Sequence, residues 1–188
     1  MSLKPDRSLL KKENEGIEHI DGLFSYAMIL TRNRTEAEDL VQETYVRAIA
    51  AMGRLREGSN VKSWLFTILR NVWLNQLRQR RTAPLMSDLP VEESGVEVVE
   101  KGKDPYALYI SKIERQQVHS AIGQLPVDAR EIIMLREFEE LSYQEIATIL
   151  DCPAGTVMSR LARARSKLRT LLSAGISTPM SDGRVDQV

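Results

Sequence analysis

The chain has 188 residues, with 26 basic and 26 acidic side chains and a formal net charge of zero at pH 7. This length allows one domain or two small ones, and 43% hydrophobic and 28% charged residues are typical of an ordinary soluble protein. No apolar run could span a membrane, the single Cys152 excludes an internal disulfide, and the distant His19 and His119 leave little material for a metal site.

The first residues lack the apolar segment of a signal peptide, so we expect a cytoplasmic protein. We also expect no cofactor. The charges fall in blocks along the chain. Basic residues gather at 78–81 and 160–169, and acidic residues gather at 36–43 and 88–104. Such blocks suggest a protein that meets DNA with some surfaces and a protein partner with others.

Two helices are predicted after a mobile tail over residues 1–14. The first runs from Ile17 to Leu30, and its inward face is expected to be Ile17, Ile20, Phe24, Ala27 and Met28. After a break at residues 31–34, Thr35 and Glu38 match a capping box that opens a second helix, which ends near Met52. Its expected inward residues are Ala37, Leu40, Val41, Ala48 and Ile49.

The outward side of this second helix carries an acidic stripe. Asp39, Gln42 and Glu43 stand at positions i, i+3 and i+4, so two carboxylates and an amide share one face. The stripe is either a solvated surface or a docking surface for a basic partner helix.

Glycines at 53 and 58 predict a loop that ends at Ser59 and Asn60, which can cap the next helix. The following residues, 61–81, read as one long helix with Trp64, Leu65, Ile68 and Val72 buried. Its other faces carry Lys62, Arg70, Asn71, Trp73, Asn75 and Arg78. This mixture suits stacking on unpaired bases and tracking phosphates, although Trp73 could equally seal the edge of a helical bundle.

The apolar residues over 83–104 show no helical or strand periodicity, which predicts a flexible acidic linker. Six acidic residues face only two lysines there. The linker is either a passive tether or an acidic strand that occupies a basic channel in a partner.

A second helical unit begins near Tyr106. The apolar residues expected on one face of its first helix are Ile110, Ile113, Val118, Ala121, Ile122 and Leu125. Pro126 ends that helix and Asp128 helps to open the next. The residues expected to pack in this next helix are Ala129, Ile132, Ile133, Leu135 and Phe138.

The strongest local pattern is a helix-turn-helix. Ser142 and Glu145 form a capping box that predicts a short helix from Tyr143, and Pro153 stops it. The second helix buries a stripe of Val157, Leu161, Ala164, Leu168 and Leu171, and its opposite side carries Thr156, Ser159, Arg160, Arg163 and Lys167.

The second helix of such a motif lies in the major groove of DNA, where arginine can bond guanine O6 and N7. Ser159, Arg160 and Arg163 share one exposed face. The helix has five basic residues between positions 154 and 172 and no acidic one. The plainer alternative is a solvated amphipathic helix of an ordinary bundle. The remaining residues, 174–188, read as a mobile tail, and no strand pattern occurs.

Three stretches carry a family resemblance: AEDLVQETYVRA at 37–48, SWLFTILRN at 63–71, and LPVDAREIIMLREFEELSYQEIATILDCPAGTVMSRLARARSKLR at 125–169. They closely resemble extracytoplasmic-function sigma factors, the smallest group of bacterial sigma factors. The resemblance spans most of the chain and implies a region-two domain over 15–82 and a region-four domain over 105–173.

The resemblance implies two binding surfaces in region two. The core RNA polymerase would be bound through its clamp helices by Asp39, Leu40, Gln42 and Glu43. The minus-ten element, including a base flipped from the non-template strand, would be bound by Arg56, Ser59, Asn60, Lys62, Arg70, Asn71, Asn75 and Arg78. Flipping is least costly where the duplex is already being melted.

In region four, the resemblance implies that the minus-thirty-five element is read by Thr156, Met158, Ser159, Arg160, Arg163 and Lys167. Two departures from the family concern these surfaces. Asn75 stands where many members have aspartate, and Met158 and Ala162 stand where some members carry larger or basic residues, so the promoter sequence cannot be transferred.

We therefore expect an all-α protein of two small helical domains joined by a flexible acidic linker, the second ending in a helix-turn-helix. The expected function is that of an alternative sigma factor without catalysis or a small-molecule substrate. Its partners would be core RNA polymerase, promoter DNA and an anti-sigma factor, and it would be monomeric outside these complexes. The alternatives are a stand-alone helix-turn-helix regulator, or a recombinase or nuclease with a helix-turn-helix tail.

Overall fold

A computed structural model describes residues 16–56, 58–82 and 116–176. Every regular element in these ranges is a helix, which confirms the all-α prediction. The elements are α2 (Ile20–Thr31), α3 (Arg34–Ala51), the 3-10 helix η1 (Met52–Arg54), α4 (Val61–Thr82), a helix over 116–123, α6 (Val127–Ile133), the π-helix η2 (Met134–Phe138), α7 (Tyr143–Leu150) and α8 (Ala154–Ile176). The predicted linker at 83–104 and both predicted tails, apart from the start of the second, lie outside the described residues.

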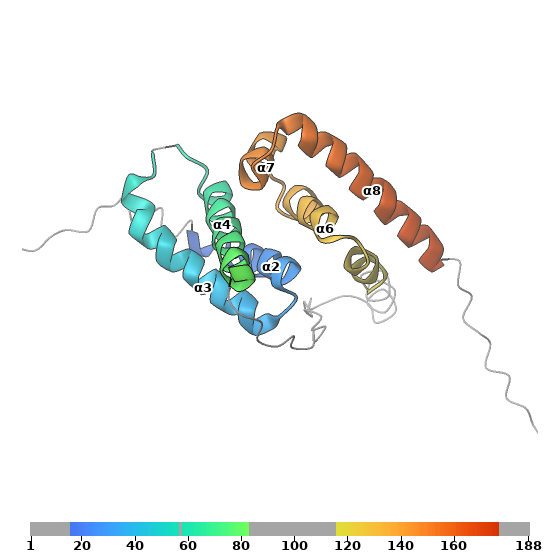
Figure 1. The fold of residues 1–188 in the computed structure, drawn as a ribbon. Helices are drawn as coiled ribbons and strands as arrows, with labels where there is room; N and C mark the ends of the chain where they lie inside the picture. The colour runs from blue at the N-terminus through green and yellow to red at the C-terminus, as the bar shows by residue number, and fades with distance from the viewer. Residues whose placement is uncertain (1–15, 57, 83–115, 177–188) are drawn as a thin grey trace, which may run out of the picture.

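The helices form two groups that lie side by side (Figure 1). The first group is α2, α3 and α4, and the second is α6, α7 and α8, with α8 on the outer edge (Figure 1). The groups touch, since α4 contacts α7 and α2 contacts α6. One hydrophobic cluster of buried residues runs through both groups. In the described ranges, no helix has the length and apolarity needed to cross a membrane.

The turn between α2 and α3 differs from the prediction. Arg32 adopts a left-handed conformation with φ 55° and ends α2. The side chain of Asn33 then accepts a hydrogen bond from the backbone N–H of Glu36 at 3.0 Å, so α3 begins at Arg34. The predicted capping box of Thr35 and Glu38 is therefore wrong, because Asn33 caps the helix two residues earlier and Thr35 lies in its first turn.

The buried face of α2 also differs from the prediction. Its core residues are Leu23, Tyr26, Ala27 and Leu30, whereas Ile17 and Ile20 are 61% and 46% exposed. A turn at 18–19 separates Ile17 from α2, and within α2 the buried face runs through Leu23, Tyr26, Ala27 and Leu30, which leaves Ile20 toward solvent. In α3, Ile49 is likewise exposed rather than inward, since the buried line runs through Thr44 and Ala48.

Helix α4 is continuous, as predicted, and Asn60 caps it by accepting a hydrogen bond from the N–H of Ser63 at 3.1 Å. Its fully buried side chains include Leu65, Phe66 and Leu69. The predicted core residues Trp64 and Ile68 are only half-buried against this core.

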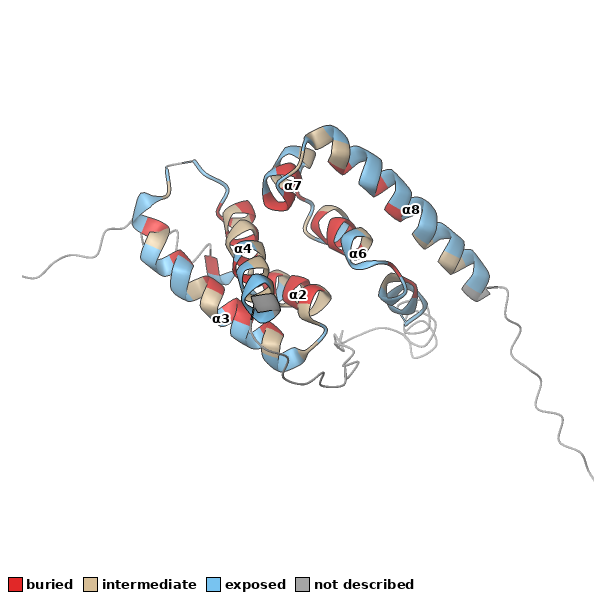
Figure 2. Ribbon diagram, viewed as in Figure 1, coloured by how far each residue is buried: buried red, intermediate tan, exposed pale blue. Residues whose placement is uncertain are grey.

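The helix-turn-helix of α7 and α8 is confirmed. The Ser142 side chain accepts from the N–H of Glu145 at 3.3 Å, and the Glu145 carboxylate accepts from the N–H of Ser142 at 2.8 Å. The stripe of α8 is buried at Val157, Leu161 and Ala164, and the rest of the helix is largely exposed (Figure 2).

Before this motif, α6 passes into the π-helix η2, whose wider turn shifts the positions that follow. Met134 and Leu135 are buried, but Phe138 is 56% exposed, so its predicted inward place is wrong. Val118 of the preceding helix is also partly exposed, whereas Ala121 and Leu125 are buried as predicted.

Candidate nucleic-acid interface and docking surface

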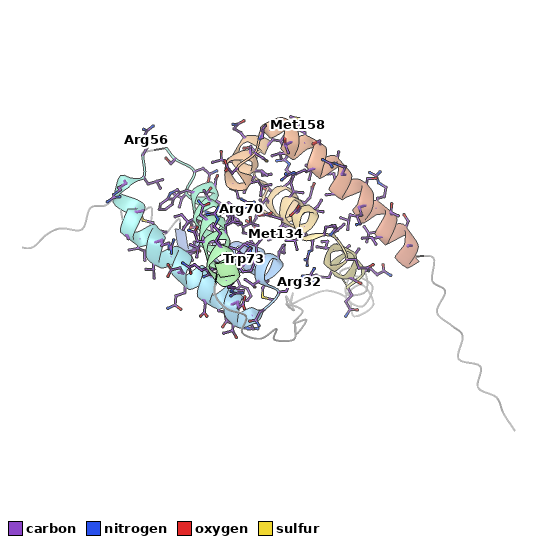
Figure 3. All side chains as sticks on the ribbon, in the orientation of Figure 1. Arg32, Arg56, Arg70, Trp73, Met134 and Met158 are labelled. Carbon is purple, nitrogen blue, oxygen red and sulfur yellow. The ribbon has the colours of Figure 1, made fainter. Side chains whose placement is uncertain are left out.

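The predicted recognition face lies at the free side of α8. Met158, Ser159, Arg160, Arg163 and Lys167 are all exposed there, and Thr156 is half-exposed. Met158 lies at the N-terminal end of α8, beside α7 (Figure 3). The hydroxyl of Ser159 donates to the Thr156 carbonyl at 3.0 Å, and Nε of Arg163 donates to the Ser159 carbonyl at 3.2 Å. No carboxylate is paired with Arg160 or Arg163 in the described ranges, so the Arg160 guanidinium and the terminal nitrogens of Arg163 can meet an incoming ligand.

Arg165 differs from these residues because it already has a partner. Its Nη2 lies 2.6 Å from Oε1 of Glu137 in η2, within the same group of helices. This hydrogen-bonded pair raises the pKa of Arg165. Arg165 is therefore less available for a phosphate contact than Lys167.

The acidic stripe of α3 is exposed at Asp39 and Gln42 and half-exposed at Glu43. Glu43 forms an i, i+4 pair with Arg47 at 2.6 Å. Leu40 is fully buried in the core, so its side chain cannot touch a partner in this arrangement and instead supports the stripe from beneath. The stripe continues along α3 into Val46 and Ile49, which are 58% and 62% exposed, and sequence periodicity placed Ile49 inside the protein.

The residues predicted to bind the minus-ten element divide into two sets. Those exposed to solvent are Arg56, Ser59, Asn60, Asn71, Asn75 and Arg78. Arg56 stands on the loop before α4 and points away from the second group of helices (Figure 3). Lys62 and Arg70 are half-buried, and Arg70 lies between α4 and α6 (Figure 3).

Arg70 is engaged by Glu131 of α6. Its Nε lies 2.8 Å from Oε1 of Glu131, and its Nη1 donates to the Ile149 carbonyl at 3.3 Å. The same Glu131 oxygen accepts a 2.6 Å hydrogen bond from the hydroxyl of Tyr26. Burial disfavours the charged guanidinium, but the carboxylate outweighs it, so the pKa of Arg70 is raised. Burial and the same carboxylate raise the pKa of Tyr26.

Lys62 and Asn60 have carboxylate partners as well. Nζ of Lys62 lies 2.8 Å from Oε2 of Glu139 and donates to the Glu139 carbonyl at the same distance. The amide of Asn60 donates to Oε1 of Glu145. Three residues of the predicted minus-ten set are therefore occupied by carboxylates of the second group of helices. The pairing was not predicted, because its partners are 61 to 85 residues apart in the chain.

Trp73 is half-buried against the core, and the guanidinium of Arg80 lies 5.9 Å from its ring centroid. Arg80 also pairs with Glu36 of α3 at 3.1 Å. These contacts favour the interpretation of Trp73 as a residue that seals the bundle edge. They leave the exposed amides of Asn71 and Asn75 as the polar groups of α4 best able to meet a base. In the same described ranges, no three His, Cys, Asp or Glu side chains are grouped as a metal site.

Two protein-family models match this chain, one for each of the two groups of helices. The model of sigma-70 region 2 matches residues 17–82, and the model of sigma-70 region 4 matches residues 115–168. The acidic stripe and the predicted minus-ten residues lie in the first match. The recognition face of α8 lies in the second.

Curated relatives match most of the chain. It is 37% identical over 153 residues to the ECF RNA polymerase sigma factor EcfG of Rhodopseudomonas palustris, a match that covers 81% of this chain and 80% of the relative. It is 38% identical over 137 residues to the RNA polymerase sigma-H factor of Pseudomonas aeruginosa, with 71% of each chain covered.

Two solved structures are similar as well. The sigma factor RpoE of Bartonella quintana, in complex with the anti-sigma factor NepR, matches with a TM-score of 0.66 and 32% identity over 86% of this chain and 96% of that one. CnrH, in complex with the cytosolic domain of CnrY, matches with a TM-score of 0.56 and 26% identity over 87% and 88% of the two chains.

Proposed function

This chain belongs to the extracytoplasmic-function sigma factors of RNA polymerase, and from that premise we propose which of its surfaces perform the steps of promoter recognition. As a member of this family, it is an alternative sigma factor that directs promoter-specific transcription initiation. The observation that carries the assignment of surfaces is the presence of an exposed acidic stripe on α3 and an exposed basic face on α8 in one chain.

The acidic stripe docks on core RNA polymerase. Asp39, Gln42 and Glu43 present carboxylates and an amide to a basic helix of the partner, and such charge complementarity increases specificity and the association rate. Val46 and Ile49 extend the same surface with apolar area that is unfavourably exposed in the free chain. Leu40 contributes by fixing the helix beneath the stripe.

The exposed face of α8 reads the minus-thirty-five element. Arg160 and Arg163 can each form two hydrogen bonds to a guanine edge, and the apolar side chain of Met158 can contact a thymine methyl group. Thr156 and Ser159 have hydroxyl groups for phosphates or bases near the helix N-terminus. Lys167 lies further along and supplies a phosphate contact, which adds affinity without sequence information.

The minus-ten element is held by the loop before α4 and by the exposed amides of that helix. Arg56, Ser59 and Asn60 surround the loop end, where a flipped base would be captured, and Asn71 and Asn75 meet bases along α4. Arg78 contacts the phosphate backbone of the DNA. Asn60, Lys62 and Arg70 bind nucleic acid only after they exchange their carboxylate partners for it.

The partners and location follow from these roles. The chain acts in the cytoplasm on core RNA polymerase and promoter DNA, is monomeric outside these complexes, and has no catalytic site or small-molecule substrate of its own. The similar sigma factor RpoE has been solved in complex with the anti-sigma factor NepR, and the similar CnrH in complex with the cytosolic domain of CnrY, which supports an anti-sigma factor as a further partner of this chain.

Run-off transcription tests the proposed function. Core RNA polymerase is incubated with a promoter library in the presence and absence of the full chain, and the transcripts are sequenced. We expect new start sites only when the chain is present, downstream of two shared sequence elements. A stand-alone regulator would instead form a stable dimer, bind a palindrome without polymerase and produce no new start site.

A further inference from the structure

Arg130 of α6 is a buried cation without an acceptor in the described ranges. The residue is 6% exposed, and its Nε and Nη2 atoms are buried with no hydrogen-bond partner among the described residues. A buried charge is costly unless it is paired and hydrogen-bonded, and a buried polar group without a partner therefore needs an explanation. A buried arginine in this state is a candidate for binding an anion.

The two unpaired nitrogens of Arg130 lie on the same edge of the guanidinium group. Their N–H groups point in the same direction and can bind two oxygens of a carboxylate or a phosphate at once. Arg165 uses this edge in the same chain, because its Nε and Nη2 both donate to Oε1 of Glu137, at 2.8 and 2.6 Å. In Arg130 the same two donors have no such acceptor among the described residues.

The carboxylates nearest to Arg130 along the chain do not pair with it. Glu131, the next residue, accepts from the Tyr26 hydroxyl at 2.6 Å and from Nε of Arg70 at 2.8 Å. Asp128 lies two positions earlier on α6, and residues two apart on a helix do not face each other. No ion pair of the described ranges includes Arg130. An acceptor for its unpaired edge must therefore come from outside these ranges.

A second guanidinium group lies near Arg130. Helix α2 contacts α6, and burial and the nearby charge of Arg32, at the end of α2, lower the pKa of Arg130. Arg32 is exposed at that helix end (Figure 3). Its backbone is left-handed, with φ 55°, a conformation that glycine usually adopts at the end of a helix. The chain thus places a large cationic side chain at a strained position beside a buried side chain of the same charge.

We propose that Arg32 and Arg130 form a binding site for a phosphate dianion, supplied as inorganic phosphate or as a small phosphate monoester. The Nε and Nη2 edge of Arg130 binds two of the phosphate oxygens. The exposed side chain of Arg32 covers the outer oxygens and completes the neutralisation. Neither residue belongs to the surfaces proposed for core polymerase or promoter DNA, so the site is additional to the proposed function.

The charge of the arginine pair favours a phosphate over other anions. Both guanidinium groups are charged at neutral pH, and a phosphate monoester carries about −1.5 to −2 there. A carboxylate or a chloride ion would neutralise only one of the two charges. A phosphate of the DNA backbone has a single charge and a substituent on each side. It therefore cannot present a free end to a side chain as buried as that of Arg130.

The two arginines provide variants that should fold more stably when phosphate is absent. Arg130→Met removes the buried unpaired charge at similar length, and Arg32→Gly relieves the left-handed backbone. Both should raise the urea midpoint of the full chain in chloride buffer. Phosphate should raise the midpoint of the parent, because a ligand that binds only the folded chain stabilises it, but it should not raise that of either variant.

The matched control is Arg54→Gln, which removes the same charge from an exposed arginine of η1. Calorimetric titration of the full chain with sodium phosphate, against sodium chloride at the same ionic strength, measures binding directly. We expect one phosphate per chain. Binding should be at least tenfold weaker for Arg130→Met and Arg32→Gly and unchanged for Arg54→Gln.

Titration with adenosine 5′-monophosphate distinguishes the two sources of phosphate. Tighter binding than that of inorganic phosphate, lost in Arg130→Met, would assign the site to a phosphate monoester. Equal or weaker binding would assign it to inorganic phosphate. Either result supports the site.

A parent chain that binds neither inorganic phosphate nor the monophosphate would overturn the proposal. Phosphate binding that Arg130→Met and Arg32→Gly both retain would overturn it as well. Equal stabilisation of the parent by phosphate and by chloride at the same ionic strength would show charge screening instead of a site. None of these measurements uses core polymerase or promoter DNA, so their outcome is independent of the proposed function.

Discussion

The Nε atom of Arg70 on α4 lies 2.8 Å from the carboxylate of Glu131 on α6. This ion pair joins a residue predicted to bind promoter DNA to a residue of the group of helices that carries the recognition helix. The two groups of helices, which carry the two parts of the proposed promoter-binding surface, are therefore in contact, and each exposed part of that surface can be tested by itself.

Arg160→Ala should weaken initiation mainly at promoters whose upstream element matches the chain's preference. If Arg160 forms two hydrogen bonds to a guanine, the loss of discrimination should be about 1–3 kcal/mol. Initiation rates on matched and mutated upstream elements measure the effect, and Arg169→Ala is the control on the same helix. An equal loss on every template would contradict a base-reading role.

Asp39→Arg should weaken binding to core RNA polymerase, because it reverses the charge at the head of the acidic stripe on α3. Asp39 is exposed, so the helix content should not change. Titration of core polymerase with a fluorescent chain measures the affinity. Glu38→Arg makes the same charge change at a neighbouring exposed position, and an equal loss for both variants would argue against a localised docking surface.

Asn33→Ala should lower the free energy of unfolding by about 1 kcal/mol, the usual contribution of an N-cap side chain. Thr35→Ala should have a much smaller effect, because Thr35 lies inside the first turn of α3 and does not cap it. Urea denaturation of the two variants distinguishes these positions. A larger loss for Thr35→Ala would mean that α3 begins later than described.

Glu145 should make stability depend on pH in acid. Burial raises the pKa of its carboxyl, but hydrogen bonds from Ser142 and Asn60 and the charge of Lys62 outweigh burial, so the pKa is lowered overall. A lowered pKa means that the stabilisation is present above the unfolded value of about 4.3 and is lost as pH falls through the folded value. Urea midpoints of the parent and Glu145→Gln should therefore differ at neutral pH and converge in acid. A constant difference across this range would contradict the assignment.

Local signals account for the parts of the fold that were predicted correctly. The capping box of Ser142 and Glu145 involves groups three residues apart, and the buried stripe of α8 follows from its own periodicity. The mistakes arose where another local or tertiary contact decided the outcome. Asn33 capped α3 ahead of Thr35, and the turn at 18–19 separated Ile17 from α2.

The candidate site was predictable only as separate surfaces. The recognition face of α8 and the stripe of α3 each lie on one helix, so spacing alone brings their residues together. The contact of Glu131 with Tyr26 spans 105 positions, and nothing in the local pattern of α6 distinguishes Glu131 from a solvated residue. Leu40 shows the opposite kind of mistake. Family resemblance implied that it contacts core RNA polymerase, but its side chain is fully buried.

The central claim is that one chain holds a promoter at two points, and it is tested most directly by run-off transcription on four templates with core RNA polymerase. One template carries both promoter elements selected from the library, two carry a single element, and one carries neither. We predict strong initiation only from the template with both elements. We also predict that initiation on every template requires the full chain. Equal initiation from a template that lacks either element, or initiation without the chain, would contradict the claim.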